Sequence, residues 1–175
     1  MAPLAGVLVA AGSSRRMGRD KLWIEIGGRP VWRWALDALL GAADVDLVAV
    51  VIPAGSQAAF RAAVPASTRC VFVSGGAVRA DSVLAGLDAL AARRVAEETT
   101  VLVHDAARPA VTTGLIERVA DAATTSGAAV PVVPLRDALW RLAIHARGSS
   151  LAEPLGRQGA VAAQTPQAGR LGELR

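Results

Sequence analysis

A glycine- and arginine-rich segment follows the first apolar run of this 175-residue chain and ends at Lys21, the only lysine beside eighteen arginines. The segment reads Gly6-Val-Leu-Val-Ala-Ala-Gly-Ser-Ser-Arg-Arg-Met-Gly-Arg-Asp-Lys21. Small residues let the backbone approach a ligand, while backbone N–H groups and cationic side chains bind anions. The pattern therefore predicts a phosphate site, with Ala10, Ala11 and Gly12 against a flat base or ribose. The alternative is that a compositional bias toward arginine left one lysine here by chance.

A second motif, Val101-Leu-Val-His-Asp-Ala-Ala-Arg-Pro109, places Asp105 and Arg108 after an apolar run. Ligands of open α/β sheets bind at the carboxyl ends of strands, so both side chains should face the crevice of the first segment. Asp105 is the one candidate ligand for Mg²⁺, or a partner of a sugar hydroxyl. His104 is expected to be structural. The competing interpretation is a capping aspartate beside a surface arginine.

Two further segments carry polar residues in loops. In Ser74-Gly-Gly-Ala-Val-Arg-Ala-Asp-Ser82, Arg79 and Ser82 lie near a predicted helix N-terminus, where an anion or a base carbonyl would be well placed. The segment from Arg157 to Gln167 offers Arg157 as an anion contact and an extended turn at Thr165. Neither GxxxxGK[ST] nor GxGxxG occurs in the first segment.

Short valine-rich runs alternate with helical patterns along the chain, which predicts an α/β fold with a mainly parallel sheet in one domain over 1–175. A stretch at Leu135–Gln158 breaks the rhythm and predicts a hairpin or a projecting arm. The tail after Gln167 predicts the start of a helix, so we expect a chain that stops in mid-fold. The predicted strands are Leu4–Ala10, Leu47–Ile52, Cys70–Val73, Thr100–His104 and Ala128–Val133, and the predicted helices are Pro30–Leu40, Gln57–Ala63, Arg79–Arg94 and Thr113–Thr125.

The amino-acid composition limits the classes of molecule that the chain is expected to bind and the compartment in which it is expected to occur. The net charge is +4, but the arginines are spread along the chain with few aromatic residues, which favours phosphorylated small molecules over nucleic acid. No apolar run is long enough to span a membrane, and the N-terminus lacks the order of a secretory signal. The single cysteine, Cys70, excludes an internal disulfide. These features predict a cytoplasmic protein.

Five motifs resemble, in the same order, those of the 2-C-methyl-D-erythritol 4-phosphate cytidylyltransferase family. They are AAGSSRRMGRDK, SGGAVRADS, VHDAARP, VPLRD and QTPQ, and the resemblance covers Leu4 to Gln167. It implies a three-layer Rossmann-like nucleotidyltransferase fold. It also implies transfer of CMP from CTP to methylerythritol phosphate, with Mg²⁺ and release of pyrophosphate.

The resemblance assigns roles to individual positions. It also implies that Leu135–Gln158 is an arm that crosses to a second subunit, so that the protein is a homodimer. The implied catalytic residues are Arg16, Lys21 and Arg157; the nucleotide-binding residues are Ala10, Ala11, Gly12, Ser13, Ser14, Gly76, Arg79, Ser82, Asp105 and Ala106; the substrate-binding residues are Asp105, Arg108, Asp137 and Thr165.

The chain departs from the family pattern at three places. Asp20 stands where the family usually has proline, and Ala138 stands where it has threonine. The family continues beyond the position of Arg175 and has a second substrate-positioning lysine there, so we expect a truncated form. Three alternatives remain: a cytidylyltransferase for ribitol 5-phosphate or another polyol phosphate, a molybdenum-cofactor guanylyltransferase, against which VHDAARP argues, and a CTP-binding remnant without turnover.

Overall fold

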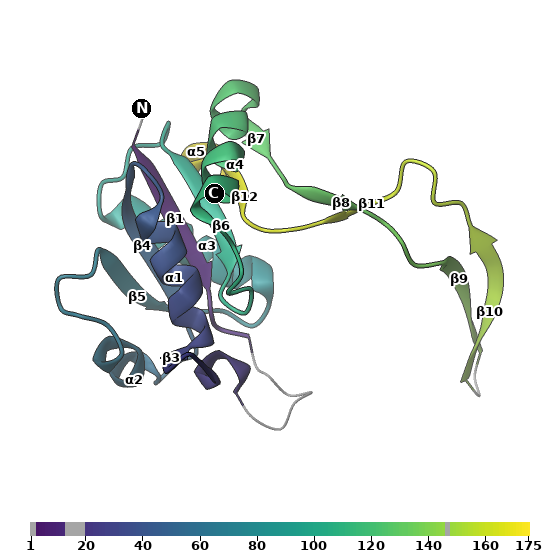
Figure 1. The fold of residues 1–175 in the computed structure, drawn as a ribbon, viewed down its shortest axis with the longest axis horizontal. Helices are drawn as coiled ribbons and strands as arrows, with labels where there is room; N and C mark the ends of the chain where they lie inside the picture. The colour runs from purple at the N-terminus through teal and green to yellow at the C-terminus, as the bar shows by residue number, and fades with distance from the viewer. Residues whose placement is uncertain (1–2, 13–19, 146–147) are drawn as a thin grey trace. The chain divides into compact units, whose positions relative to one another are not determined.

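The computed structural model describes residues 3–12, 20–145 and 148–175, which form two compact units (Figure 1). The sheet unit contains Met1–Val130 and Thr165–Arg175, and the arm unit contains Pro131–Gln164. The arm unit is thus inserted in sequence into the sheet unit.

The sheet unit is built on six strands in the order β5-β4-β1-β6-β12-β7. The first four are mutually parallel, and β12 runs antiparallel to both of its neighbours, β6 and β7. The predicted mainly parallel sheet is therefore confirmed. The strands are β1 (Leu4–Val9), β4 (Val45–Ile52), β5 (Cys70–Ser74), β6 (Thr100–Asp105), β7 (Ala128–Ala129) and β12 (Gln167–Arg170).

Helices cover both faces of this sheet, which makes three layers. One buried cluster joins the sheet to α1, α2 and α4, and a second joins the opposite face to α3 and α5. A short 3₁₀ turn and a small hairpin precede α1. The elements are η2 (Lys21–Trp23), β2 (Glu25–Ile26), β3 (Arg29–Pro30), α1 (Val31–Gly41), α2 (Gln57–Ala62), α3 (Arg79–Ala92), α4 (Thr113–Ser126) and α5 (Leu171–Leu174).

Strand β1 shows why these strands lack an alternating apolar pattern. Leu4 and Leu8 pack into the cluster that holds α1, whereas Ala5 and Val7 pack into the cluster that holds α3. Both faces of the strand are therefore buried, and apolar side chains are needed at consecutive positions.

The fit of α3 on the sheet depends on Gly86. A methyl group at this position would lie 2.5 Å from Val7 Cγ1 and 2.9 Å from Val51 Cγ2. We expect Gly86→Ala to lower the free energy of unfolding by about 1–3 kcal/mol, because overpacking outweighs the gain of about 0.5–1 kcal/mol that alanine brings to a helix. Gly114→Ala in α4 is the matched control, since its methyl group would meet only the flexible end of Arg118 at 3.7 Å. Urea denaturation should show opposite signs for the two variants, and equal signs would contradict the prediction.

One predicted strand is wrong, and one predicted helix begins later than expected. Ala128–Val133 was expected to be one strand, but β7 ends at Ala129 and β8 (Val132–Pro134) pairs in a different sheet. Pro131 separates them, because proline lacks the N–H that a ladder requires. The tail after Gln167 was expected to begin a helix. It forms β12 first, since pairing with β6 overrides the weak strand preference of Ala168 and Gly169, and the helix α5 begins only at Leu171.

The arm unit consists of two antiparallel pairs. Strand β8 pairs with β11 (Val161–Ala163), and β9 (Leu139–His145) pairs with β10 (Gly148–Leu155). The hairpin predicted within Leu135–Gln158 is thereby confirmed.

Candidate functional site

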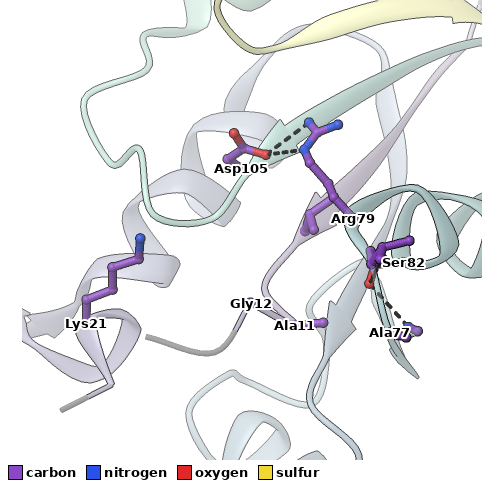
Figure 2. A pocket seen from close by; sticks show the side chains of 10 residues that line it. Ala11, Gly12, Lys21, Ala77, Arg79, Ser82 and Asp105 are labelled. Carbon is purple, nitrogen blue, oxygen red and sulfur yellow. Dashed lines mark hydrogen bonds and ion pairs between the residues drawn. The ribbon is translucent and has the colours of Figure 1, made fainter. Parts of the chain in front are cut away.

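A pocket of about 410 Å³ opens where β1, β5 and β6 end, on the edge of the sheet that forms ligand sites in open α/β folds (Figure 2). Its volume is in the usual range for small-molecule sites. The pocket brings together three of the segments that the sequence singled out. It is lined by Val9, Ala11, Gly12, Lys21, Gly76, Ala77, Val78, Arg79, Ser82 and Asp105.

Among the residues that the structure describes, two cations line this pocket from different elements. Lys21 is the first residue of η2, and Arg79 is the first residue of α3. In the view of Figure 2 their side chains lie on opposite sides of Gly12. Arg79 also stands at the N-terminus of a 14-residue helix, where unpaired backbone N–H groups favour negative charge. The pocket can therefore hold an anionic ligand.

Asp105 lies between two guanidinium groups. Its Oδ1 accepts hydrogen bonds from Arg79 Nη2 at 3.0 Å and from Nε at 3.2 Å, while Arg108 Nε lies 3.4 Å from Oδ2. Asp105 thus faces the same pocket as the first segment, as predicted. Arg108 contacts Asp105 but does not line the pocket.

The loop between β5 and α3 is held by side chains of the helix that it enters. Ser82 Oγ accepts from Gly76 N at 3.2 Å and donates to the Val78 carbonyl at 3.2 Å. Asp81 Oδ2 accepts from Val78 N at 3.3 Å, which caps the helix start. The buried Ser82 hydroxyl therefore shapes the wall of the pocket through the loop backbone.

His104 is fully buried beneath the site, as expected for a structural residue. Its Nε2 lies 3.1 Å from the Arg108 carbonyl, which can only accept, so Nε2 carries the proton. Its Nδ1 accepts from Thr165 Oγ1 at 2.9 Å. Burial lowers the pKa of His104, although the Arg108 carbonyl and Asp105 favour the charged form. The ring is thus held neutral and ties Thr165 to the end of β6.

We expect stability to depend on His104 in mild acid. Because the folded pKa lies below the ordinary value of 6.5, the unfolded chain binds the proton first. The contribution is complete above about pH 6.5 and is lost as pH falls toward the lowered pKa. His145→Gln leaves His104 as the only histidine, so NMR titration of that variant reads its pKa directly. A midpoint at or above 6.5 would contradict the prediction.

The predicted residues fall into five groups. Ala11, Gly12, Lys21, Gly76, Arg79, Ser82 and Asp105 line the pocket, whereas Ala10 and Ala106 are buried and do not. Arg108 and Thr165 contact the end of β6. Asp137 and Arg157 belong to the arm unit, where Arg157 Nη1 donates to the Arg136 carbonyl. The predicted positions Ser13, Ser14 and Arg16 lie outside the described residues.

Sequence reasoning missed four residues at the pocket. Val9, Ala77 and Val78 line it, and at Gly75 Ala11 and Ser82 leave no room for a Cβ. The signal for Gly75 was present, because it precedes Gly76 in the same glycine pair. The apolar residues had no chemical signal of their own.

The acidic side chains near the pocket decide whether it could hold the Mg²⁺ that the family resemblance implies. Within the described ranges, no three His, Cys, Asp or Glu side chains cluster as metal ligands do. Among the described residues that line the pocket, Asp105 is the one carboxylate that could supply a ligand to Mg²⁺, which uses one or two protein carboxylates together with substrate phosphates. Arg79 and Arg108 already contact its two oxygens, so a metal would have to share this carboxylate with them. None of the helices in these ranges could cross a membrane.

A mainly parallel sheet between two helical layers, with a pocket lined by Lys21 and Arg79 at its strand ends, matches the Rossmann-like nucleotidyltransferase fold of solved structures. The comparisons narrow this class. The family model for "IspD: 2-C-methyl-D-erythritol 4-phosphate cytidylyltransferase" matches residues 4–175, and the chain belongs to this family. The predicted family is confirmed.

Relatives differ in how much of their length the chain spans. It is 41% identical over 165 residues to the bifunctional enzyme IspD/IspF of Anaeromyxobacter sp. strain Fw109-5, covering 94% of this chain but 42% of that protein. It is 38% identical over 174 residues to the 2-C-methyl-D-erythritol 4-phosphate cytidylyltransferase of Bacillus velezensis, covering 97% and 71%. The crystal structure of the same enzyme from Thermus thermophilus matches with a TM-score of 0.71 and 35% identity, again covering 97% of this chain and 71% of that chain.

Proposed function

We propose that this chain transfers CMP from CTP to 2-C-methyl-D-erythritol 4-phosphate, giving CDP-methylerythritol and pyrophosphate. The observation that carries the proposal is the pocket in which Lys21 and Arg79 meet small residues of the first loop at the strand ends. The family match and the relatives named for this reaction support the choice of substrates.

The reaction requires charge stabilisation more than proton transfer. A phosphate oxygen of methylerythritol phosphate attacks the α-phosphorus of CTP, and the bond from that phosphorus to the bridging oxygen of pyrophosphate breaks. The nucleophile is already an anion, so no general base is needed. Fixed positive charge from Lys21, aided by Arg16 as the resemblance implies, stabilises the charge on the α-phosphoryl oxygens and the leaving group.

The other candidate residues are assigned to the nucleotide, to the second substrate or to the metal. Ala11 and Gly12 are our candidates for the close approach of base and ribose to the backbone, and Arg79 and Asp105, which also line the pocket, are candidates for contacts to the nucleotide. Arg108, Asp137, Arg157 and Thr165 are our candidates for methylerythritol phosphate. Asp105 together with the CTP phosphates would hold Mg²⁺, which supplies positive charge to the phosphoryl groups.

We also propose a homodimer formed through the arm unit. Trp140, Leu142 and Ile144 alternate along β9 and therefore share one face, and Leu151 pairs with Leu142 on the same face. All four are exposed. An isolated hairpin is marginal in water, so a second copy of the arm would stabilise it. A single domain over 1–175 and a cytoplasmic location stay predictions.

One assay tests the function and separates the alternatives. The 175-residue chain is incubated with CTP, Mg²⁺ and each polyol phosphate, and pyrophosphate release is measured. Release with methylerythritol phosphate supports the proposal. Release with ribitol 5-phosphate alone would assign the other substrate, and CTP binding without release in either case would identify a remnant without turnover.

A further inference from the structure

Lys21 lines the pocket from a very short element. Turn η2 has three residues and 3₁₀ geometry. So short a turn is unstable alone, because each residue fixed returns few hydrogen bonds. The direction of the Lys21 side chain therefore depends on what holds the turn at each end.

The N-terminal end is held by Asp20. Its Oδ1 accepts a hydrogen bond from Leu22 N at 3.0 Å, and its carbonyl accepts from Trp23 N at 3.2 Å. The backbone of Asp20 is extended, with φ −74° and ψ 106°, which is the geometry of an N-cap residue. Asp20 is therefore linked by two hydrogen bonds to the residues that follow Lys21, and these bonds fix the backbone on both sides of Lys21.

The C-terminal end is held by packing. Trp23 meets Phe60 edge to face with ring centroids 5.0 Å apart, and meets Trp32 at 6.0 Å. Both partners are buried, and so is Leu22. Aromatic pairs in this geometry contribute beyond their buried area. The two residues after Lys21 are thus fixed to the core, while Lys21 itself lines the pocket.

We propose that Asp20 and Trp23 are positioning residues that hold the Lys21 ammonium group toward the pocket, Asp20 by capping the turn rather than by its charge. The inference rests on the function proposed for Lys21. A capping role and a charge role make opposite predictions for asparagine, which caps as well as aspartate but is neutral.

The single lysine of the chain provides a readout that does not need turnover. In protein labelled with ¹³C and ¹⁵N only in lysine, every side-chain signal belongs to Lys21. We expect the wild type and Asp20→Asn to show the same dispersed signals and the same shift on addition of CTP. We expect Asp20→Ala to move the signals toward those of a free lysine and to reduce the CTP-induced shift.

Kinetics provide the second readout. Asp20→Ala should lower kcat about fivefold, the effect of losing a typical cap, with KM for CTP changed less than about twofold. Asp20→Asn should restore kcat. Trp23→Phe keeps an edge-to-face ring, so its kcat should resemble that of the wild type. Trp23→Ala should show the same loss of kcat as Asp20→Ala. If Trp23→Ala does not fold, the positioning role is tested by the other three variants.

The outcomes separate this inference from the proposed function. Unchanged Lys21 signals in Asp20→Ala, or equal losses in Asp20→Asn and Asp20→Ala, would overturn the capping role. A wild type that releases no pyrophosphate with either polyol phosphate would refute the proposed function, while the lysine signals would still decide whether Asp20 and Trp23 position Lys21.

Discussion

Lys21→Ala is expected to lower kcat about 100-fold, the usual effect of removing one group that stabilises developing oxyanion charge. Lys21 lines the pocket together with Arg79. In the proposed reaction, its loss removes positive charge that stabilises the negative charge developing on the α-phosphoryl and pyrophosphate oxygens. KM for CTP should change less, because the interaction strengthens in the transition state. Steady-state pyrophosphate release measures both constants.

The matched control removes a cation elsewhere. Arg118 is exposed on α4 and does not line the pocket, so Arg118→Ala should leave kcat within about twofold of the wild type. Lys21→Arg keeps the charge but changes its shape and reach, and should retain part of the rate. A kcat for Lys21→Ala equal to that of Arg118→Ala would remove Lys21 from the proposed chemistry.

Gly75→Ala is expected to weaken CTP binding about tenfold and to lower the free energy of unfolding by about 1–3 kcal/mol. A methyl group at Gly75 would overlap the Cβ of Ala11 and lie 2.8 Å from Ser82 Oγ. The Ala11 methyl group is fixed to the backbone and cannot rotate away. The end of β1 must therefore move from the β5–α3 loop, and both form walls of the pocket.

Calorimetric titration with CTP and urea denaturation measure the two effects. Gly41→Ala is the control, since its methyl group would meet only Thr113 Cγ2, at an ordinary 3.6 Å. Wild-type CTP affinity in Gly75→Ala would show that the two walls can separate at no cost to the site, which argues against a nucleotide bound between them.

Much of the site could be predicted because its residues follow strands. Strand β1 is buried on both faces, so its apolar run is unbroken, and parallel strands end at one edge. That logic is enough to place Gly12, Arg79 and Asp105 in one pocket. It could not show that Ser82 acts through the loop backbone, because the partners of a hydroxyl depend on distances in three dimensions.

The errors in the fold have a common physical origin. Ala168 and Gly169 carry little strand preference, and only their pairing with β6 and β7 makes them a strand. Pro131 lies within an apolar run, although its missing N–H divides two sheets. The local sequence pattern indicates which secondary structure a segment favours. Where that preference is weak, long-range strand pairing decides which secondary structure forms.

The pairing of β12 with β7 also bears on how this family can vary. Ala129 is paired with Ala168, so the chain leaves the sheet for the arm and returns to it on adjacent strands. Such neighbouring attachment points are the kind at which insertions are tolerated. The arm unit can therefore change in length between relatives while the strands behind the pocket stay paired. Because the candidate substrate residues Asp137 and Arg157 belong to the arm, such a change would alter substrate binding together with the proposed assembly.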